Sequence, residues 1–158
     1  MKHALPTLLA CVAGTASAAP AEGLSSRYPD VRWTEEAALE ADLDGDGRSD
    51  RFAMGIGQDG RSVIGVRLAN GRYSRLVFEP SALTCSVLEP NGCDEPAPPR
   101  ATVLRDADRR DLALMFEISP DVFVSNGRAH IIVVPVGETD PFWFYWDRHQ
   151  NALSWLRL

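Results

Sequence analysis

Lysine is almost absent from this sequence: it occurs once in 158 residues, at position 2. The rest of the chain therefore offers no lysine for a Schiff base, for a phosphate-binding loop or for general-base catalysis. Long apolar runs are also missing after the first eighteen residues. None reaches the roughly 18–20 residues that a membrane-spanning helix needs, so we expect no integral membrane span.

Positive charge is scarce as well. The sequence has 22 acidic side chains against 16 basic ones, which gives a net charge of −6, and all the basic residues except Lys2 are arginines. An acidic protein repels phosphate backbones and anionic lipid. We therefore expect neither nucleic acid nor an anionic membrane to be the main partner.

The first eighteen residues have the pattern of a secretory signal peptide. A short basic start, Met1–His3, precedes an apolar stretch, and Ala16–Ala18 fits a small-x-small cleavage site. Cleavage after Ala18 leaves 140 residues with a net charge of −7, a common size for one domain. We expect a signal peptide over 1–18, a leader over 19–33, a single domain over 34–158, and a periplasmic or secreted protein.

The sequence contains only three cysteines. Cys11 lies in the apolar start, and a lipoprotein anchored at this residue is the alternative to cleavage after Ala18. Cys85 and Cys93 follow the cleavage site, and an even cysteine count in an exported chain favours a disulfide between them. The loop that this disulfide would close is short, so it would stabilise the fold by about 2–3 kcal/mol at most.

Apolar and polar residues alternate along most of the domain, as in half-buried strands. Turn signals such as Asp59-Gly60 and Asn70-Gly71 separate the runs. Alternating or apolar runs lie near residues 39–43, 52–56, 64–68, 73–78, 103–105, 112–118, 122–124, 129–136, 142–146 and 153–155, and from them we expect about nine short strands. The sequence thus predicts an all-β domain, an antiparallel β-meander that forms a sandwich or a partly closed barrel. The one helical candidate is 34–39, where a strand fits about as well.

The most specific feature is an acidic loop between two of these runs. Residues 42–50, Asp-Leu-Asp-Gly-Asp-Gly-Arg-Ser-Asp, place carboxylates at loop positions 1, 3, 5 and 9 and glycine at position 6. Ca²⁺ binds six to eight oxygens at about 2.3–2.6 Å, and a cation relieves the repulsion among four close carboxylates. We predict a calcium site whose ligands are the side chains of Asp42, Asp44, Asp46 and Asp50 and the backbone carbonyl of Arg48.

This loop differs from an EF-hand, because loop position 12 is Ala53 instead of a bidentate Glu and the flanking residues alternate with period two. Ala41–Asp50 instead resembles the calcium hairpin of FG-GAP (VCBS-like, integrin-propeller-type) repeats. The resemblance covers about 25 residues, 38–62, and implies the same ligands as above. A propeller needs several four-stranded blades, so a chain with one such loop excludes a complete propeller.

Residues suited to catalysis are few. After the signal peptide there are two histidines, His130 in an apolar run and His149 in a turn, and there is no nucleophile-elbow motif. We expect His130 to be a hydrogen-bonded strand residue and His149 to be a surface turn residue. Two pairs of carboxylates in acid-rich segments, Asp106/Asp108 and Glu138/Asp140, would be the basis of any glycosidase chemistry.

Five consecutive aromatic residues, Phe142-Trp143-Phe144-Tyr145-Trp146, stand near the end of the chain. The run has no polar alternation, so both faces of that strand should be covered. Either the aromatics are core residues, or Trp143 and Tyr145 form an exposed platform for a protein or a glycan.

These features favour a non-enzymatic, calcium-stabilised periplasmic or secreted β domain that binds another macromolecule, a protein or a glycan. A narrower alternative is an inhibitor or immunity protein against a cell-wall hydrolase, which rests on analogy between small exported domains. A cell-envelope hydrolase is the third hypothesis, and it depends on the acidic pairs.

Overall fold

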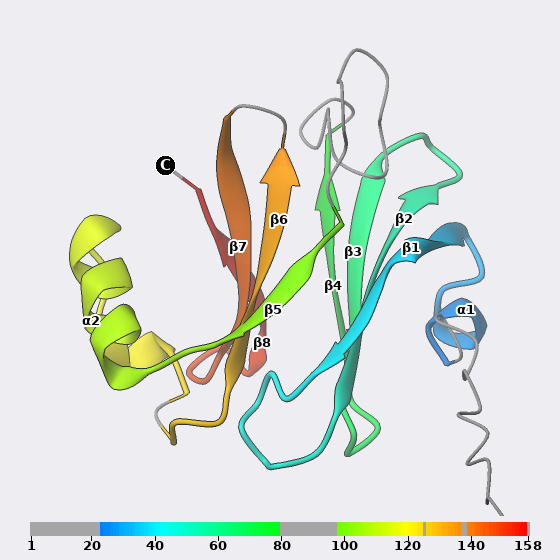
Figure 1. Cartoon of the computed structure of the whole chain (residues 1–158). Helices are drawn as coiled ribbons and strands as arrows, with labels where there is room; N and C mark the ends of the chain where they lie inside the picture. The colour runs from blue at the N-terminus through cyan, green and yellow to red at the C-terminus, as the bar shows by residue number, and fades with distance from the viewer. Residues whose placement is uncertain (1–22, 80–97, 125, 137–138, 158) are drawn as a thin grey trace, which may run out of the picture.

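The computed structural model describes residues 23–79, 98–124, 126–136 and 139–157. In this part of the chain, eight strands form two four-stranded sheets that pack against each other (Figure 1). Within each sheet, every strand pairs antiparallel with its neighbour in sequence. The predicted all-β fold, an antiparallel meander arranged as a sandwich, is confirmed.

The proposed signal peptide, Cys11 and the cysteine pair Cys85 and Cys93 lie outside the described residues, so the cleavage site and the disulfide stay predictions. None of the helices that the structure describes is long and apolar enough to cross a membrane.

The first sheet contains, in order, β1 (Val31–Ala41), β2 (Asp50–Gly57), β3 (Ser62–Arg67) and β4 (Tyr73–Phe78). The second contains β5 (Arg100–Val103), β6 (His130–Val136), β7 (Thr139–Asp147) and β8 (Ala152–Leu156). Gly60 and Gly71 occupy the two predicted hairpin turns of the first sheet with φ values of +79° and +85°, which glycine adopts without strain. The helical candidate 34–39 belongs to β1, whose register shifts between Thr34 and Ala38.

The facing sides of the two sheets share one apolar core. Alternate residues of β2, β3 and β7 enter this core: Phe52, Met54, Ile64, Val66, Phe142, Phe144 and Trp146. The rings of Phe52 and Phe144 meet across the interface with their centroids 5.8 Å apart. Burial of large side chains in this layer supplies most of the stabilisation that holds the two sheets together.

The outer face of the first sheet is covered by α1 (Leu24–Arg27) and by Trp33 of β1. Leu24 is completely buried. Trp33 lies over Gly65 of β3, and a Cβ placed on Gly65 would come within 2.4 Å of the Trp33 ring. Part of the expected leader, 19–33, thus contributes packing and the first residues of β1.

A helix replaces one predicted strand. Where alternation predicts strands over 112–118 and 122–124, the structure has α2 (Asp106–Met115) and the 3₁₀ turn η1 (Pro120–Val122), so both predictions are wrong. Carboxylates in the first turn favour the helix, and Asp108 accepts a hydrogen bond from the Arg105 N–H at 3.1 Å. Leu112 packs against the second sheet, but Leu114 is 82% exposed. The alternating pattern predicts that Leu112 and Leu114 share a buried face, whereas only Leu112 is buried.

The aromatic run of β7 is covered on both faces, as its lack of polar alternation predicts. Phe144 lies in the core between the sheets. On the outer face, Tyr145 packs against Phe123 with a centroid separation of 4.7 Å, and Trp143 packs against Phe116 at 5.8 Å. Tyr145 is 5% exposed, so it is a core residue and does not form an open platform.

Two leucine truncations test this arrangement. Leu68→Ala empties a site that is 1% exposed, and we expect it to lower the free energy of unfolding by about 2–5 kcal/mol. Leu114→Ala removes a solvent-facing side chain from α2 and should change the free energy of unfolding by no more than about 0.5 kcal/mol. Urea unfolding followed by tryptophan fluorescence measures both. Equal losses would contradict the placement of Leu114.

Candidate metal centre

The acidic loop connects β1 to β2 at one end of the sandwich. Ala41 and Asp50 pair across the two strands, so the residues between them must return within one strand spacing. Gly45 and Gly47 make this turn possible with φ values of +74° and +86°. Gly45 also has no room for a side chain, since a Cβ there would lie 2.7 Å from a methyl of Val124.

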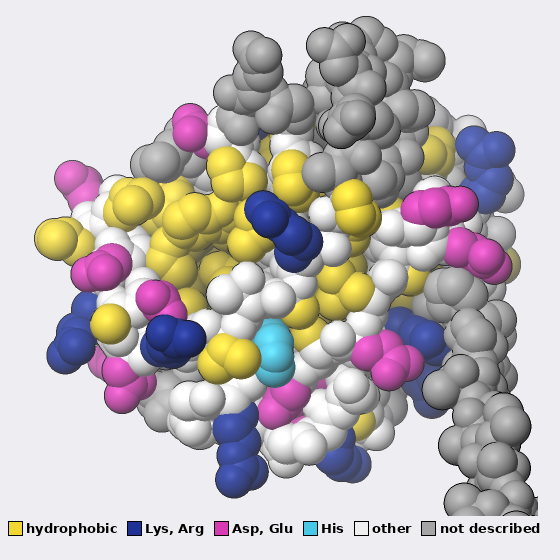
Figure 2. Space-filling view, in the orientation of Figure 1, with side chains coloured by type: hydrophobic (Ala, Val, Ile, Leu, Met, Phe, Trp, Pro, Cys, Tyr) yellow, Lys and Arg dark blue, Asp and Glu magenta, His cyan; other side chains and the backbone are white. Residues whose placement is uncertain are grey.

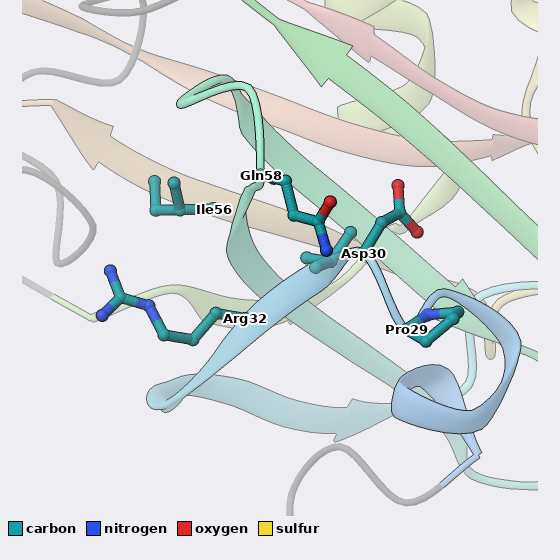
Figure 3. A pocket seen from close by; sticks show the side chains of 7 residues that line it. Pro29, Asp30, Arg32, Ile56 and Gln58 are labelled. Carbon is teal, nitrogen blue, oxygen red and sulfur yellow. The ribbon is translucent and has the colours of Figure 1, made fainter.

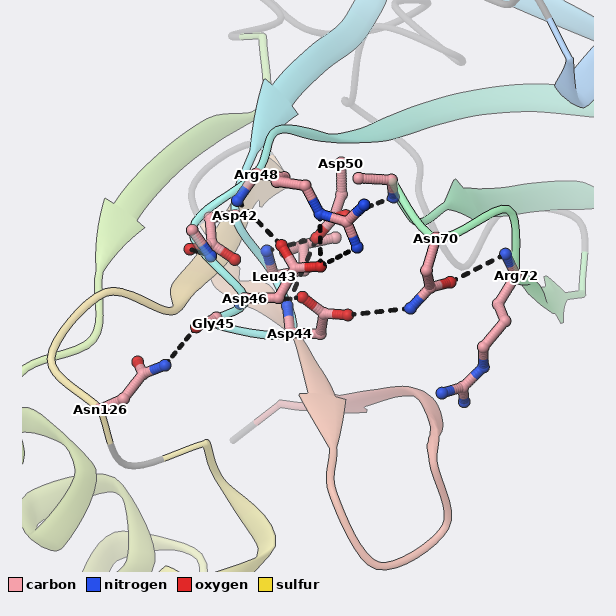
Figure 4. Close-up of polar contacts among 12 residues, drawn as sticks. Asp42, Leu43, Asp44, Gly45, Asp46, Arg48, Asp50, Asn70, Arg72 and Asn126 are labelled. Carbon is pink, nitrogen blue, oxygen red and sulfur yellow. Dashed lines mark hydrogen bonds and ion pairs between the residues drawn. The ribbon is translucent and has the colours of Figure 1, made fainter.

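Backbone N–H groups of the loop donate to its own carboxylates and hold them inward (Figure 4). Gly47 N–H donates to Asp42 Oδ2 at 2.9 Å, and Asp46 N–H donates to Asp44 Oδ1 at 3.1 Å. Short-range hydrogen bonds of this kind, in which Asp carboxylates accept from nearby backbone N–H groups, are typical of tight turns. The loop is therefore curled around its own acidic side chains.

Three of the four predicted carboxylates converge. Asp42, Asp44 and Asp50 each place one oxygen so that all three oxygens lie within 4.8 Å of one another. Two oxygens on one Ca²⁺ are at most about 5 Å apart, because each lies about 2.3–2.6 Å from the ion. Asp42 Oδ1 is buried and has no hydrogen-bond partner among the described residues. The three carboxylates together fit a metal ion.

The electrostatics of this cluster disfavour its charged form. Burial raises the pKa of Asp50 above its ordinary value, and the nearby charge of Asp44 adds to the effect. Burial likewise raises the pKa of Asp44, and the charges of Asp46 and Asp42 act in the same direction. Hydrogen bonds from backbone N–H groups oppose both shifts. A bound cation would remove the repulsion that remains.

Asp46 does not join the converging group. Its carboxylate faces Arg48, whose Nε donates to Asp46 Oδ2 at 2.9 Å. This hydrogen bond from the Arg48 side chain holds the pKa of Asp46 below its ordinary value. Asp46 and the carbonyl of Arg48 thus stay predicted ligands, while the two side chains pair with each other in the structure.

Asp50 has a structural role besides its place in the cluster. It is 1% exposed, and its two oxygens accept hydrogen bonds from the Leu43 N–H at 2.7 Å and the Ala69 N–H at 2.8 Å. Asn70 follows at the same turn and donates to Asp44 Oδ2 at 3.4 Å. Asp50 therefore ties the acidic loop to the turn between β3 and β4.

The second sheet also bonds to the acidic loop. The His130 N–H at the start of β6 donates to the Asp42 carbonyl at 2.7 Å, and the Asn126 side-chain amide donates to the Gly45 carbonyl. The sequence pattern predicts a hairpin turn at Asn70-Gly71 and does not predict the contacts of Asn70 and Asn126 with the acidic loop, because a turn signal carries no information on distant partners. The acidic loop consequently contacts both sheets.

The remaining candidate residues lie apart from the cluster. Asp106 and Asp108 are exposed in the first turn of α2, where Asp106 pairs with Arg109 at 3.2 Å. His149 is exposed in the β7–β8 turn, as expected. Glu138 falls outside the described residues.

A shallow cleft of about 350 Å³ lies where the α1–β1 connection approaches the end of β2 (Figure 3). Asp30 is its one carboxylate among the described lining residues, and it faces Arg75 at 3.5 Å. Arg32 lines the cleft too, but its guanidinium extends away from Asp30 (Figure 3). The cleft therefore does not pair two carboxylates for acid–base chemistry.

Comparison with protein-family models, with curated proteins and with solved structures finds no match to this chain. The resemblance of residues 38–62 to an FG-GAP hairpin stays a prediction.

Two substitutions separate the structural role of Asp50 from the charge of the cluster. In the presence of a chelator, Asp50→Ala leaves the N–H groups of Leu43 and Ala69 without partners, and each costs about 1–3 kcal/mol of unfolding free energy. Asp44→Asn keeps the shape of the side chain and removes its negative charge. Burial raises the pKa of the Asp44 carboxyl and so disfavours that charge, and the substitution should therefore not lower the free energy of unfolding. Chemical unfolding in EDTA measures both. A larger loss for Asp44→Asn than for Asp50→Ala would contradict these roles.

Proposed function

We propose that this protein is a non-enzymatic, calcium-stabilised β domain that works in the periplasm or outside the cell and binds another macromolecule. The observation that carries the calcium proposal is the convergence of the Asp42, Asp44 and Asp50 carboxylates, to which the buried Asp42 Oδ1 without a described hydrogen-bond partner is a second pointer. The predicted signal peptide supports the location, and the scarcity of catalytic side chains supports a binding role.

The donor set favours calcium over other metals. Every predicted ligand is an oxygen, which suits hard cations and does not suit zinc or copper. Four carboxylates and a carbonyl match the large, variable coordination sphere of Ca²⁺ better than the strict octahedron of Mg²⁺. An affinity of about 10⁻⁴–10⁻³ M, typical of extracellular modules, is sufficient at such a site.

Calcium would complete the site by drawing Asp46 away from Arg48. The Asp46–Arg48 pair lies at the surface, with the Arg48 side chain 56% exposed, and exposed ion pairs contribute little free energy. Exchanging that pair for a bond to a divalent cation is therefore favourable once the ion is present. The freed guanidinium would turn into solvent.

The position of the loop explains why one ion would affect the whole domain. The Asp42 carbonyl binds β6, the Gly45 carbonyl binds Asn126, and Asp50 binds the β3–β4 turn. An ion that orders this loop would hold all three attachments in place. We infer that calcium acts as a structural staple between the sheets.

Calcium should raise the melting temperature of the protein by several degrees relative to EDTA. Calcium at 10–100 times its dissociation constant adds about 1.4–2.7 kcal/mol to the free energy of unfolding. Differential scanning calorimetry with calcium, magnesium and EDTA measures the gain, which magnesium should not reproduce. The same melting temperature in calcium and in EDTA would refute the staple.

Two aspartates give a matched pair for the ligand assignment. Asp46 pairs with Arg48, and Asp59 pairs with Arg61 at 2.6 Å in another exposed turn, also two residues along the chain. In EDTA, Asp46→Asn and Asp59→Asn should have similar small effects on the melting temperature. In calcium, only Asp46→Asn should lose most of the gain. An undiminished gain in Asp46→Asn would exclude Asp46 as a ligand.

A further inference from the structure

An apolar groove lies on the outer face of the second sheet, and none of its lining residues belongs to the acidic loop. α2 covers only part of this face, and between the helix and strands β5, β6 and β7 the structure has a groove of about 250 Å³. Its apolar lining comes chiefly from Val103, Leu112, Met115, Ile131, Val133 and Trp143. Figure 2 shows apolar side chains gathered in a hollow beside α2.

Two apolar residues that line this groove are more exposed than the core residues beside them. Met115 is 49% exposed and Val103 is 39% exposed, and both are among the few large apolar side chains so exposed in the described part of the chain. All four residues of β5 are exposed. Exposed apolar side chains that line one groove make that groove a candidate interaction surface.

Two carboxylates also line the groove. Asp108 and Asp111 lie one helical turn apart on α2, on the side of the helix that faces the groove. Neither forms an ion pair with an arginine within the residues that the structure describes, although Asp108 accepts the Arg105 N–H. A partner that fills the groove would therefore meet unneutralised negative charge beside an apolar surface.

The size of the groove indicates the kind of occupant. Pockets that enclose drug-sized ligands have volumes of roughly 300–1,000 Å³, so 250 Å³ is small for a free ligand. It is suited to an anchoring side chain, and protein interfaces are commonly centred on one apolar or aromatic residue in such a pocket. The lining is also mostly apolar, whereas a glycan needs polar groups along its hydroxyls.

We propose that this groove docks a partner protein that inserts an apolar side chain between α2 and β6 and places a lysine or arginine beside Asp108 and Asp111. The proposal rests on the macromolecule-binding part of the proposed function and gives it a surface and a partner chemistry. The net negative charge of the chain would attract the same cationic partner from a distance.

Synthetic peptides test the docking chemistry on the full mature protein in saturating calcium. The first peptide has a central Leu-Phe flanked by lysines, and the second has the same apolar residues flanked by glutamates. Amide chemical shifts in NMR spectra report weak binding residue by residue. The lysine peptide should shift resonances of α2, β5, β6 and β7, and the glutamate peptide should bind at least about fivefold more weakly.

Matched variants locate the contact. Met115→Glu puts a charge into the groove, whereas Leu114→Glu puts the same charge on the neighbouring residue, which is 82% exposed and does not line the groove. Only Met115→Glu should abolish the shifts. Asp111→Lys should weaken binding of the lysine peptide by about five- to tenfold and strengthen binding of the glutamate peptide.

The outcomes separate this proposal from the proposed function. Absence of localised shifts with millimolar lysine peptide, or equal effects of Met115→Glu and Leu114→Glu, would overturn the groove proposal and leave the calcium staple intact. A chito-oligosaccharide that shifts the groove residues while the peptides do not would overturn the choice of a protein partner. Failure of calcium to raise the melting temperature, with peptide binding retained, would refute the staple alone.

Discussion

The buried carboxylate of Asp50 joins the acidic loop to the neighbouring turn at one end of the sandwich, and the shape of the loop depends on it. It accepts N–H groups from the loop at Leu43 and from the β3–β4 turn at Ala69, at 2.7 and 2.8 Å. Because the first of these bonds is buried and the second is partly buried, losing their acceptor would leave polar groups without partners where water has little access. These bonds help to define the shape of the loop and bring the other carboxylates close to Asp50.

That proximity has an electrostatic cost, and it is the reason the loop suits a cation. Asp42 and Asp44 converge on Asp50, while Asp46 is neutralised by Arg48 at the surface. Three of the four predicted carboxylate ligands therefore converge, and the fourth, Asp46, pairs with Arg48 instead. In the proposed function, the ion supplies the charge balance and fastens a loop that already contacts both sheets through Asp42, Gly45 and Asp50.

The two faces of the second sheet have different roles. Its inner face completes the core, and its outer face carries α2, η1 and the apolar groove. The acidic loop reaches this sheet at Asn126 and His130, which follow η1 along the chain. The residues that line the proposed groove do not include those of the acidic loop, so the proposed calcium site and docking site use different side chains.

The sequence by itself predicted the strands that flank the acidic loop, the turns at Gly60 and Gly71, and the carboxylates of the loop, because alternation and turn chemistry are local properties of the chain. Only the tertiary structure decided that Leu114 faces solvent on a helix, that Asp46 pairs with Arg48, and that Asn126 reaches Gly45 across 81 positions. Contacts between distant segments depend on how the two sheets pack, and packing is a property of the whole chain that no local pattern encodes.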